Sequence, residues 1–224
     1  MTTPILQGAQ WIFFDVGSTL LDETECLKTR FSRAAALAAD FGVATSDEEL
    51  WHVTEQAYTA CAPSPFMCAL AQLPLTRDQK QVVYDGSPYQ SAGESPYEGI
   101  VDLLTHLHKS HSLGVLANQA AGLVGRLRNL GLNGYFRCIL GSGDLGLAKP
   151  DPKIFELAAR EADARPESII MVGDRIDNDI VPARALGWRT VRVRQGIACH
   201  QSPRSPAETA DCELDAINQL TGLL

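Results

Sequence analysis

The sequence lacks several features that mark specialised classes of protein. Its six cysteines include no Cys-x-x-Cys pair and follow no regular spacing, so we expect reduced thiols rather than disulfides or a zinc site. The start of the chain has neither a basic segment nor an apolar run long enough for a signal peptide or a membrane span. Repeats and low-complexity tracts are also absent. We therefore expect a cytoplasmic globular protein with no membrane partner.

Positive charge is scarce as well. The chain has 19 lysines and arginines against 27 acidic residues, which gives a formal net charge of −8. A general nucleic-acid binder needs basic stripes to neutralise phosphates, so we expect no nucleic-acid partner. Arg189, Arg192 and Arg194 do cluster, but a solvated late strand explains them about as well. The sequence leaves open whether the protein is a monomer or a homodimer.

The most informative segment that is present is an apolar run ending in a carboxylate. Residues 11–14 are typical of a fully buried strand, and Asp15 follows directly. A buried charge without a partner is costly, so packing explains Asp15 poorly. A nucleophile or a ligand to a hard cation explains it better, since carboxylates serve both purposes. The plainer alternative is that Asp15 caps the following turn.

Two further apolar runs end in the same way. Residues 113–117 lead to Asn118, and residues 169–173 lead to Asp174 and an acidic cluster. In open α/β sheets, ligands bind outside the carboxyl ends of the strands, near the point where the strand order reverses. Asp15, Asn118 and Asp174 should therefore lie on one edge of the sheet. Asn118 could instead stabilise its own turn through its amide.

A single lysine precedes a helix start. Lys149 stands just before Asp151, a candidate helix cap, and Pro152, which suits the first helical position. In the acidic cluster we interpret Asp177 as solvated or a helix cap, and Asp179 as the better candidate for a functional role.

The alternation of strand and helix signals predicts an α/β protein with a Rossmann-like, doubly wound parallel sheet of about five strands. Strand signals stop over residues 22–94, where helical spacing takes over. We expect a core of residues 1–21 and 95–224, with 22–94 inserted as a helical domain. Within the insert, a capping box at Ser46 and starts at Pro65 and Thr76 predict three helix beginnings.

These motifs resemble the haloacid dehalogenase-like (HAD) superfamily, in the branch with a helical cap inserted after the first strand. The resemblance covers essentially the whole chain. It implies a Mg²⁺-dependent hydrolase that acts on a small phosphorylated metabolite through an aspartyl-phosphate intermediate. It also implies a nucleophile, groups that hold the transferring phosphoryl, and a metal site. The residues implied are Asp15 and Lys149 for catalysis, Thr19, Asn118 and Lys149 for phosphate binding, and Asp15, Gly17, Asp174 and Asp179 for the metal.

The chain departs from the family pattern at Gly17, Ala117 and Arg175, which indicates an atypical subgroup. Gly17 stands where an acid/base aspartate is usual; it keeps the backbone carbonyl that the family uses for metal but lacks a proton donor. Losing a general acid typically costs about 10²–10⁴-fold in rate. Two alternatives therefore stay open. The protein could bind a phosphorylated ligand with little turnover, or it could act on a carbon–halogen or carbon–phosphorus bond, the latter with Lys28.

Overall fold

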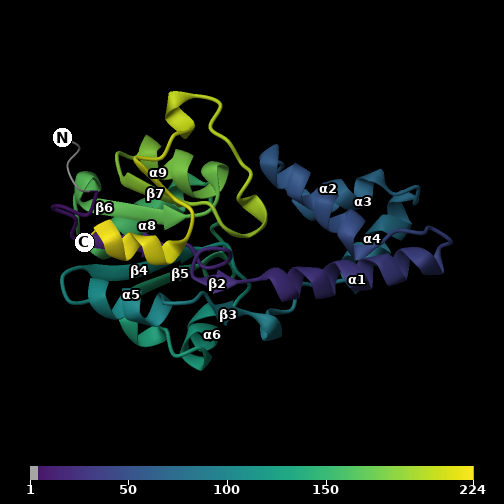
Figure 1. Cartoon of the computed structure of the whole chain (residues 1–224), viewed down its shortest axis with the longest axis horizontal. Coiled ribbons are helices and arrows are strands. Elements are labelled where there is room, and N and C mark those ends of the chain that lie inside the picture. Colours follow the sequence, from purple (N-terminus) through teal and green to yellow (C-terminus); the bar gives the residue numbers. More distant parts are fainter. Residues whose placement is uncertain (1–4, 224) are drawn as a thin grey trace. The chain divides into compact units, whose positions relative to one another are not determined.

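The computed structural model describes residues 5–223, and the chain forms two compact units (Figure 1). One comprises Met1–Leu21 and Ser95–Leu224, and the other is Asp22–Glu94. The chain passes between the units at two short strands that pair with each other, β2 (Leu21–Asp22) and β3 (Ser95–Pro96). That Asp22–Glu94 serves as a cap stays a prediction.

The larger unit is built on a parallel sheet with, in the described residues, six strands in the order β5-β4-β1-β6-β7-β8. The strands are β1 (Trp11–Phe14), β4 (Ser112–Ala117), β5 (Phe136–Gly141), β6 (Ile169–Gly173), β7 (Arg189–Val193) and β8 (Cys212–Leu214). The predicted α/β, doubly wound architecture is confirmed. The strand beyond the five expected is β8, whose three residues contain no apolar run.

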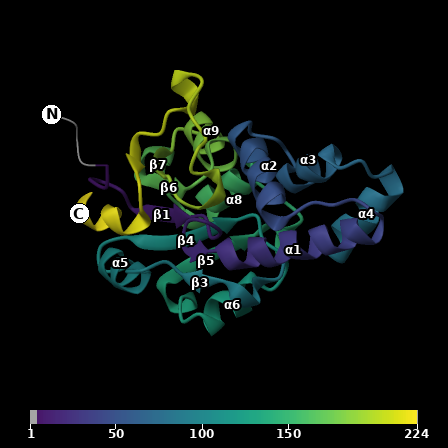
Figure 2. The same cartoon turned by 45° about the vertical axis from the view of Figure 1, so that its right-hand side comes forward.

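Helices cover both faces of this sheet (Figures 1 and 2). Successive side chains of β1 alternate between the faces: Ile12 and Phe14 belong to one buried cluster, and Phe13 belongs to the other. The first cluster includes side chains of α5 and α6, and the second those of α8 and α9. These helices, with the short α7, are α5 (Ile100–Leu107), α6 (Leu123–Asn129), α7 (Ser142–Leu145), α8 (Pro152–Ala162) and α9 (Val181–Ala185).

The strand order places β1 between β4 and β6, with later strands on both sides. The order therefore reverses at β1, and ligands of doubly wound sheets bind at the carboxyl ends of the strands at such a point. Asp15 follows β1 directly. Short helical turns lie in the connections between the strands: η2 (Asn133–Tyr135), η3 (Pro166–Ser168), η4 (Ile176–Ile180, π-helical), η5 (Gly196–Ala198) and η6 (Pro206–Glu208). A further turn, η7 (Ile217–Leu223), follows β8.

The smaller unit is helical, with α1 (Thr24–Asp40), α2 (Asp47–Thr59), α3 (Pro65–Gln72), α4 (Arg77–Gly86) and the turn η1 (Ser91–Gly93). The predicted helix starts are confirmed: Ser46 and Thr76 each form a capping box, and Pro65 occupies the first turn of α3. The helical spacing of apolar residues in the sequence extends to Phe41 and Cys61, but α1 and α2 end before these positions.

The interpretation of β7 as a solvated strand is wrong at its centre. Arg192 is only 1% exposed, because the backbone carbonyls of Ala198, Cys199 and Gln201 lie around its guanidinium. The serine- and proline-rich composition of residues 201–206 is typical of a loose loop, but the first of these residues, Gln201, is only 2% exposed. Among residues 5–223, no helix has the length and apolar character needed to cross a membrane.

Candidate active site

The predicted site residues converge at the carboxyl edge of the sheet. Asp15 follows β1, Asn118 follows β4 and Asp174 follows β6, and these three strands are neighbours. The backbone N–H of Asp15 donates to the carbonyl of Val172 at 2.9 Å, so the hydrogen-bonded ladder extends to the edge of the site. The parallel pairing therefore brings Asp15 together with two residues that lie more than a hundred positions later in the chain.

Lys149 is the cation at the centre of this group. Its Nζ lies 2.7 Å from Asp15 Oδ1 and 2.5 Å from Asp179 Oδ1, and the residue is only 4% exposed. Burial by itself would lower the pKa of the ammonium, but the Asp15 and Asp179 carboxylates outweigh it and raise that pKa above its usual value. Lys149 is therefore a charged, immobilised contact to the carboxylate predicted to be the nucleophile.

Asn118 fixes the backbone of the lysine. Its Nδ2 donates to the Lys149 carbonyl and its Oδ1 accepts from the Lys149 N–H, both at 2.8 Å. Beyond the lysine, Asp151 accepts from the Lys153 N–H as the cap of α8, with Pro152 at the first helical position, as predicted. In this arrangement the Asn118 amide holds the loop that carries Lys149.

Three carboxylates meet beside the lysine. Asp15, Asp174 and Asp179 each offer an oxygen, and these oxygens lie within 4.8 Å of one another. Burial, together with the charges of Asp15 and Asp179, raises the pKa of Asp174 well above the usual value for an aspartate. Burial likewise raises the pKa of Asp179 to about 6, against the opposing effect of the Lys149 ammonium. The negative charge is thus concentrated where water cannot screen it.

This donor set fits a hard divalent cation. Carboxylate oxygens are the ligands that Mg²⁺ prefers, and the ion needs only one or two of them beside its waters. A dication would also relieve the repulsion that raises the pKa values of Asp174 and Asp179. Asp15, Asp174 and Asp179 are therefore the residues that could hold it.

Further contacts shape the acidic turn. The N–H of Arg175 donates to Asp179 Oδ2 at 3.0 Å, and the Arg175 guanidinium pairs with the Asp177 carboxylate. Asp177 also accepts from Gln201 Nε2 at 3.0 Å. The interpretation of Asp177 as solvated is therefore wrong: it anchors its own turn. Sequence reasoning missed Gln201, because nothing in residues near position 201 signals a contact with position 177.

The turn after Asp15 contains the other two predicted residues. Val16 O accepts from the N–H groups of Thr19, Leu20 and Leu21, which closes the turn tightly. Gly17 is buried and forms a backbone bridge with Leu21. The Thr19 hydroxyl is buried and has no hydrogen-bond partner among residues 5–223. Phosphate binding by Thr19 stays a prediction.

Comparison with known proteins decides the family. The sequence model of the haloacid dehalogenase-like hydrolase family matches residues 9–187, which include residues of both units. The chain belongs to this hydrolase family. A glyceraldehyde 3-phosphate phosphatase from Methanopyrus kandleri is 30% identical over 219 residues, covering 93% of this chain and 94% of that protein. A glyceraldehyde 3-phosphate phosphatase from Pyrococcus furiosus is 28% identical over 198 residues, covering 83% of this chain and 80% of that protein.

Solved structures of the family share the fold. The HAD-hydrolase YfnB from Bacillus subtilis, bound to magnesium, has a TM-score of 0.72 at 19% identity, covering 96% of this chain and 98% of that one. A 2-haloacid dehalogenase from Pseudomonas syringae pv. Tomato DC3000 has a TM-score of 0.61 at 24% identity, covering 96% and 97%. At these identities the likeness concerns the fold alone.

Proposed function

We propose that this chain is a Mg²⁺-dependent phosphatase of small phosphorylated metabolites, with Asp15 as the nucleophile and Asp22–Glu94 as a substrate-selecting cap. The observation that carries the proposal is the contact of Lys149 Nζ with both Asp15 and Asp179, beside the third carboxylate of Asp174. Relatives named glyceraldehyde 3-phosphate phosphatase make that ester the first substrate to test.

The reaction proposed uses these side chains as follows. Asp15 Oδ attacks the phosphorus in line, the bond from phosphorus to the ester oxygen breaks, the leaving oxygen takes a proton from water, and the phosphoryl group becomes an acyl phosphate on Asp15. Lys149 neutralises charge on the transferring oxygens, and water then hydrolyses the acyl phosphate. Bound Mg²⁺, held by Asp15, Asp174, Asp179 and the Gly17 carbonyl, would supply further neutralisation of the same oxygens.

A second candidate function follows from Gly17. This residue has no side chain to protonate a leaving group, and it lies on the buried turn after Asp15. A protein that binds a phosphorylated ligand and turns it over weakly would tolerate this loss. The carbon–phosphorus alternative through Lys28 has less support, because Lys28 is exposed and forms a 2.8 Å ion pair with Glu25.

The test is a panel of phosphate esters, including glyceraldehyde 3-phosphate, assayed for phosphate release with Mg²⁺ and with a chelator. Wild-type protein should release phosphate only with Mg²⁺, and Asp15→Asn should reduce the rate by at least about 10³-fold, since an amide does not attack phosphorus. Circular dichroism should show that the variant is folded. Turnover by Asp15→Asn near the wild-type rate would refute the assignment. Ligand binding without turnover would favour the second candidate.

A further inference from the structure

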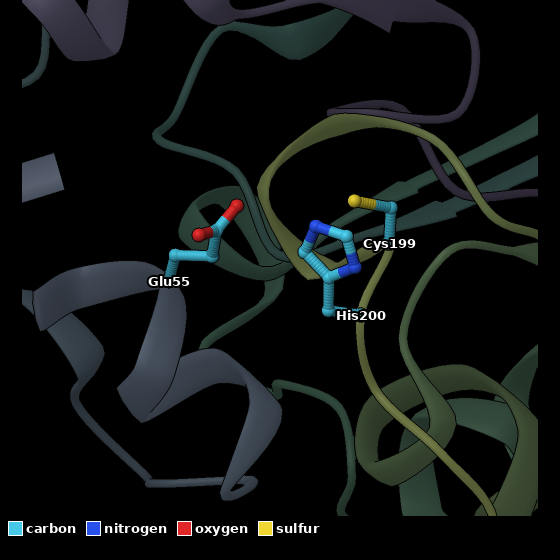
Figure 3. Close-up of side chains that lie close together, drawn as sticks. All are labelled: Glu55, Cys199 and His200. Carbon is cyan, nitrogen blue, oxygen red and sulfur yellow. The ribbon is translucent and has the colours of Figure 1, made fainter. Parts of the chain in front are cut away.

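The segment that follows β7, residues 194–201, contacts both turns of the candidate site; we name it the β7 loop. Gln195 Nε2 donates to the Thr19 carbonyl at 3.0 Å, on the turn that follows Asp15. Gly196 lies so close to the same turn that a Cβ there would be 2.2 Å from Ser18 Oγ. Figure 3 shows two side chains of this loop, Cys199 and His200. The first residues of the β7 loop therefore lie against the turn that follows Asp15.

A buried arginine organises the backbone of the β7 loop. Arg192 donates from Nη2 to the Gln201 carbonyl at 2.7 Å, and makes longer contacts with the carbonyls of Ala198 and Cys199. Its Nε lies 3.4 Å from the Asp174 carbonyl. A buried guanidinium is costly unless its donors are satisfied, so the loop carbonyls are held around it. One cation thus fixes Gln201 and touches the backbone of Asp174.

The side chain of Gln201 reaches into the acidic turn with both of its polar atoms. Its Oε1 accepts from the Ile176 N–H at 2.7 Å, and its Nε2 donates to Asp177 Oδ1 at 3.0 Å. Ile176 opens η4, where the first N–H groups of a helical turn have no partner within the turn. Gln201 therefore ties down the segment that separates Asp174 from Asp179.

We propose that Gln201 is a positioning residue for the metal site: it fixes the turn between Asp174 and Asp179 so that both carboxylates are held in place for a divalent cation, while Arg192 fixes Gln201. The proposal rests on the proposed Mg²⁺ site. Residues that orient metal ligands through hydrogen bonds typically affect metal affinity or activity by about 10–100-fold when they are replaced.

The experiment compares Gln201→Met with a matched control, Gln219→Met. Methionine keeps the length of glutamine but makes neither hydrogen bond. Gln219 accepts from the Asp215 N–H at 2.9 Å, outside the site, so its replacement removes a similar bond elsewhere. Calorimetric titration with MgCl₂ should show affinity at least about tenfold weaker in Gln201→Met and unchanged in Gln219→Met. Amide hydrogen exchange over residues 175–179, measured without metal, should accelerate only in Gln201→Met.

A second variant guards against loss of the fold. Gln201→Glu keeps an acceptor for the Ile176 N–H but presents a carboxylate to Asp177, so it should protect the Ile176 amide better than Gln201→Met does. Thermal unfolding of each variant reports whether it is folded. Wild-type protein that binds no Mg²⁺ would overturn the proposed function. If the wild type binds Mg²⁺ and Gln201→Met binds it with equal affinity, only the positioning role is overturned. Amide exchange over residues 175–179 that is unchanged in both Gln201 variants would overturn the same role.

Discussion

Asn118 and Lys149, which are 31 residues apart, are joined by a pair of hydrogen bonds that use both atoms of the asparagine amide and both polar atoms of the lysine backbone. The same lysine places its Nζ between Asp15 and Asp179. Asn118 thus connects the end of β4 to the cation of the site. Its contribution to catalysis would pass through Lys149, in addition to any contact with substrate.

The first prediction concerns this pair. Asn118→Leu should lower the free energy of unfolding by about 1–3 kcal/mol, because it leaves the N–H and carbonyl of buried Lys149 without their partners. Urea unfolding measures the change. Asn129→Leu is the control, since Asn129 is exposed at the end of α6 and should tolerate the change. An Asn118→Leu protein of wild-type stability with only a raised KM would mean that Asn118 acts on the substrate alone.

The edge of the sheet was predictable from the sequence. Apolar runs ending in Asp15, Asn118 and Asp174 identify buried parallel strands, and the carboxyl ends of such strands meet at one edge. The helix starts at Ser46, Pro65 and Thr76 were also predictable, because caps are local signals carried by residues three or four apart.

The supports behind the site were not predictable. Arg192 looks solvated in the sequence, and it is buried because the carbonyls of Ala198, Cys199 and Gln201, which follow β7, lie around its guanidinium. Gln201 follows no motif, yet its amide bonds to a turn 24 or 25 residues earlier in the chain. Such contacts depend on the tertiary structure, so they cannot be predicted from patterns among residues that are close in the sequence.

The second prediction concerns Gly173, the last residue of β6. A Cβ at this position would lie 2.4 Å from Asp179 Cγ, so Gly173→Ala must displace the Asp179 side chain from its place beside Lys149. We expect a loss of about 1–3 kcal/mol in the free energy of unfolding. We also expect weaker Mg²⁺ binding in calorimetry.

Gly125→Ala is the matched control for Gly173→Ala. Gly125 lies in α6, and nothing lies within 4 Å of the Cβ that alanine would add. Alanine should there leave stability unchanged or raise it by up to about 1 kcal/mol, because it is the better helix former. If Gly173→Ala and Gly125→Ala had the same effect on the free energy of unfolding and on Mg²⁺ binding, the placement of the Asp179 side chain would not depend on a glycine at position 173.

The third prediction concerns Asp174 and pH. Burial and the charges of Asp15 and Asp179 raise the pKa of Asp174 in the folded state, so folding favours its protonated form. Without metal, wild-type stability should therefore decrease as the pH rises from the usual titration range of aspartate, about 4, through the raised pKa. Asp174→Asn cannot ionise, and should escape the part of this decrease that Asp174 contributes, whereas Asp179 contributes its own part in both proteins.

Thermal unfolding at pH 5 and pH 7.5 checks this sign. Without Mg²⁺ at pH 7.5, the Asp174→Asn protein should melt a few degrees above the wild type, where about 2–4 °C corresponds to 1 kcal/mol in a protein of this size. The difference should shrink at pH 5. With Mg²⁺ at pH 7.5, the wild type should gain stability and the variant should not. A variant that melts below the wild type without metal would contradict the account of Asp174.

The last prediction concerns Gly17 and the leaving group. If the chain keeps its nucleophile and metal site but lacks a proton donor, aryl and acyl phosphates should react faster than alkyl phosphates, whose leaving oxygen needs a proton. Gly17→Asp would place a carboxyl on the same turn as Asp15 while keeping the backbone carbonyl. Among residues 5–223, Gly17 is not one of the glycines with a positive φ, so its backbone is open to aspartate.

The measurement is the ratio of alkyl to aryl phosphate hydrolysis in the two proteins. Gly17→Asp should raise this ratio by about 10²-fold, at the lower end of what a general acid contributes, because only the poor leaving group gains from protonation. Gly17→Asn is the matched control: it adds similar bulk but no titratable proton, and should leave the ratio at the wild-type value. An unchanged ratio in a folded, Mg²⁺-binding Gly17→Asp protein would mean that position 17 is not where the acid is missing. The binding function would then become the better account of a chain that keeps Asp15, Lys149 and Asp174.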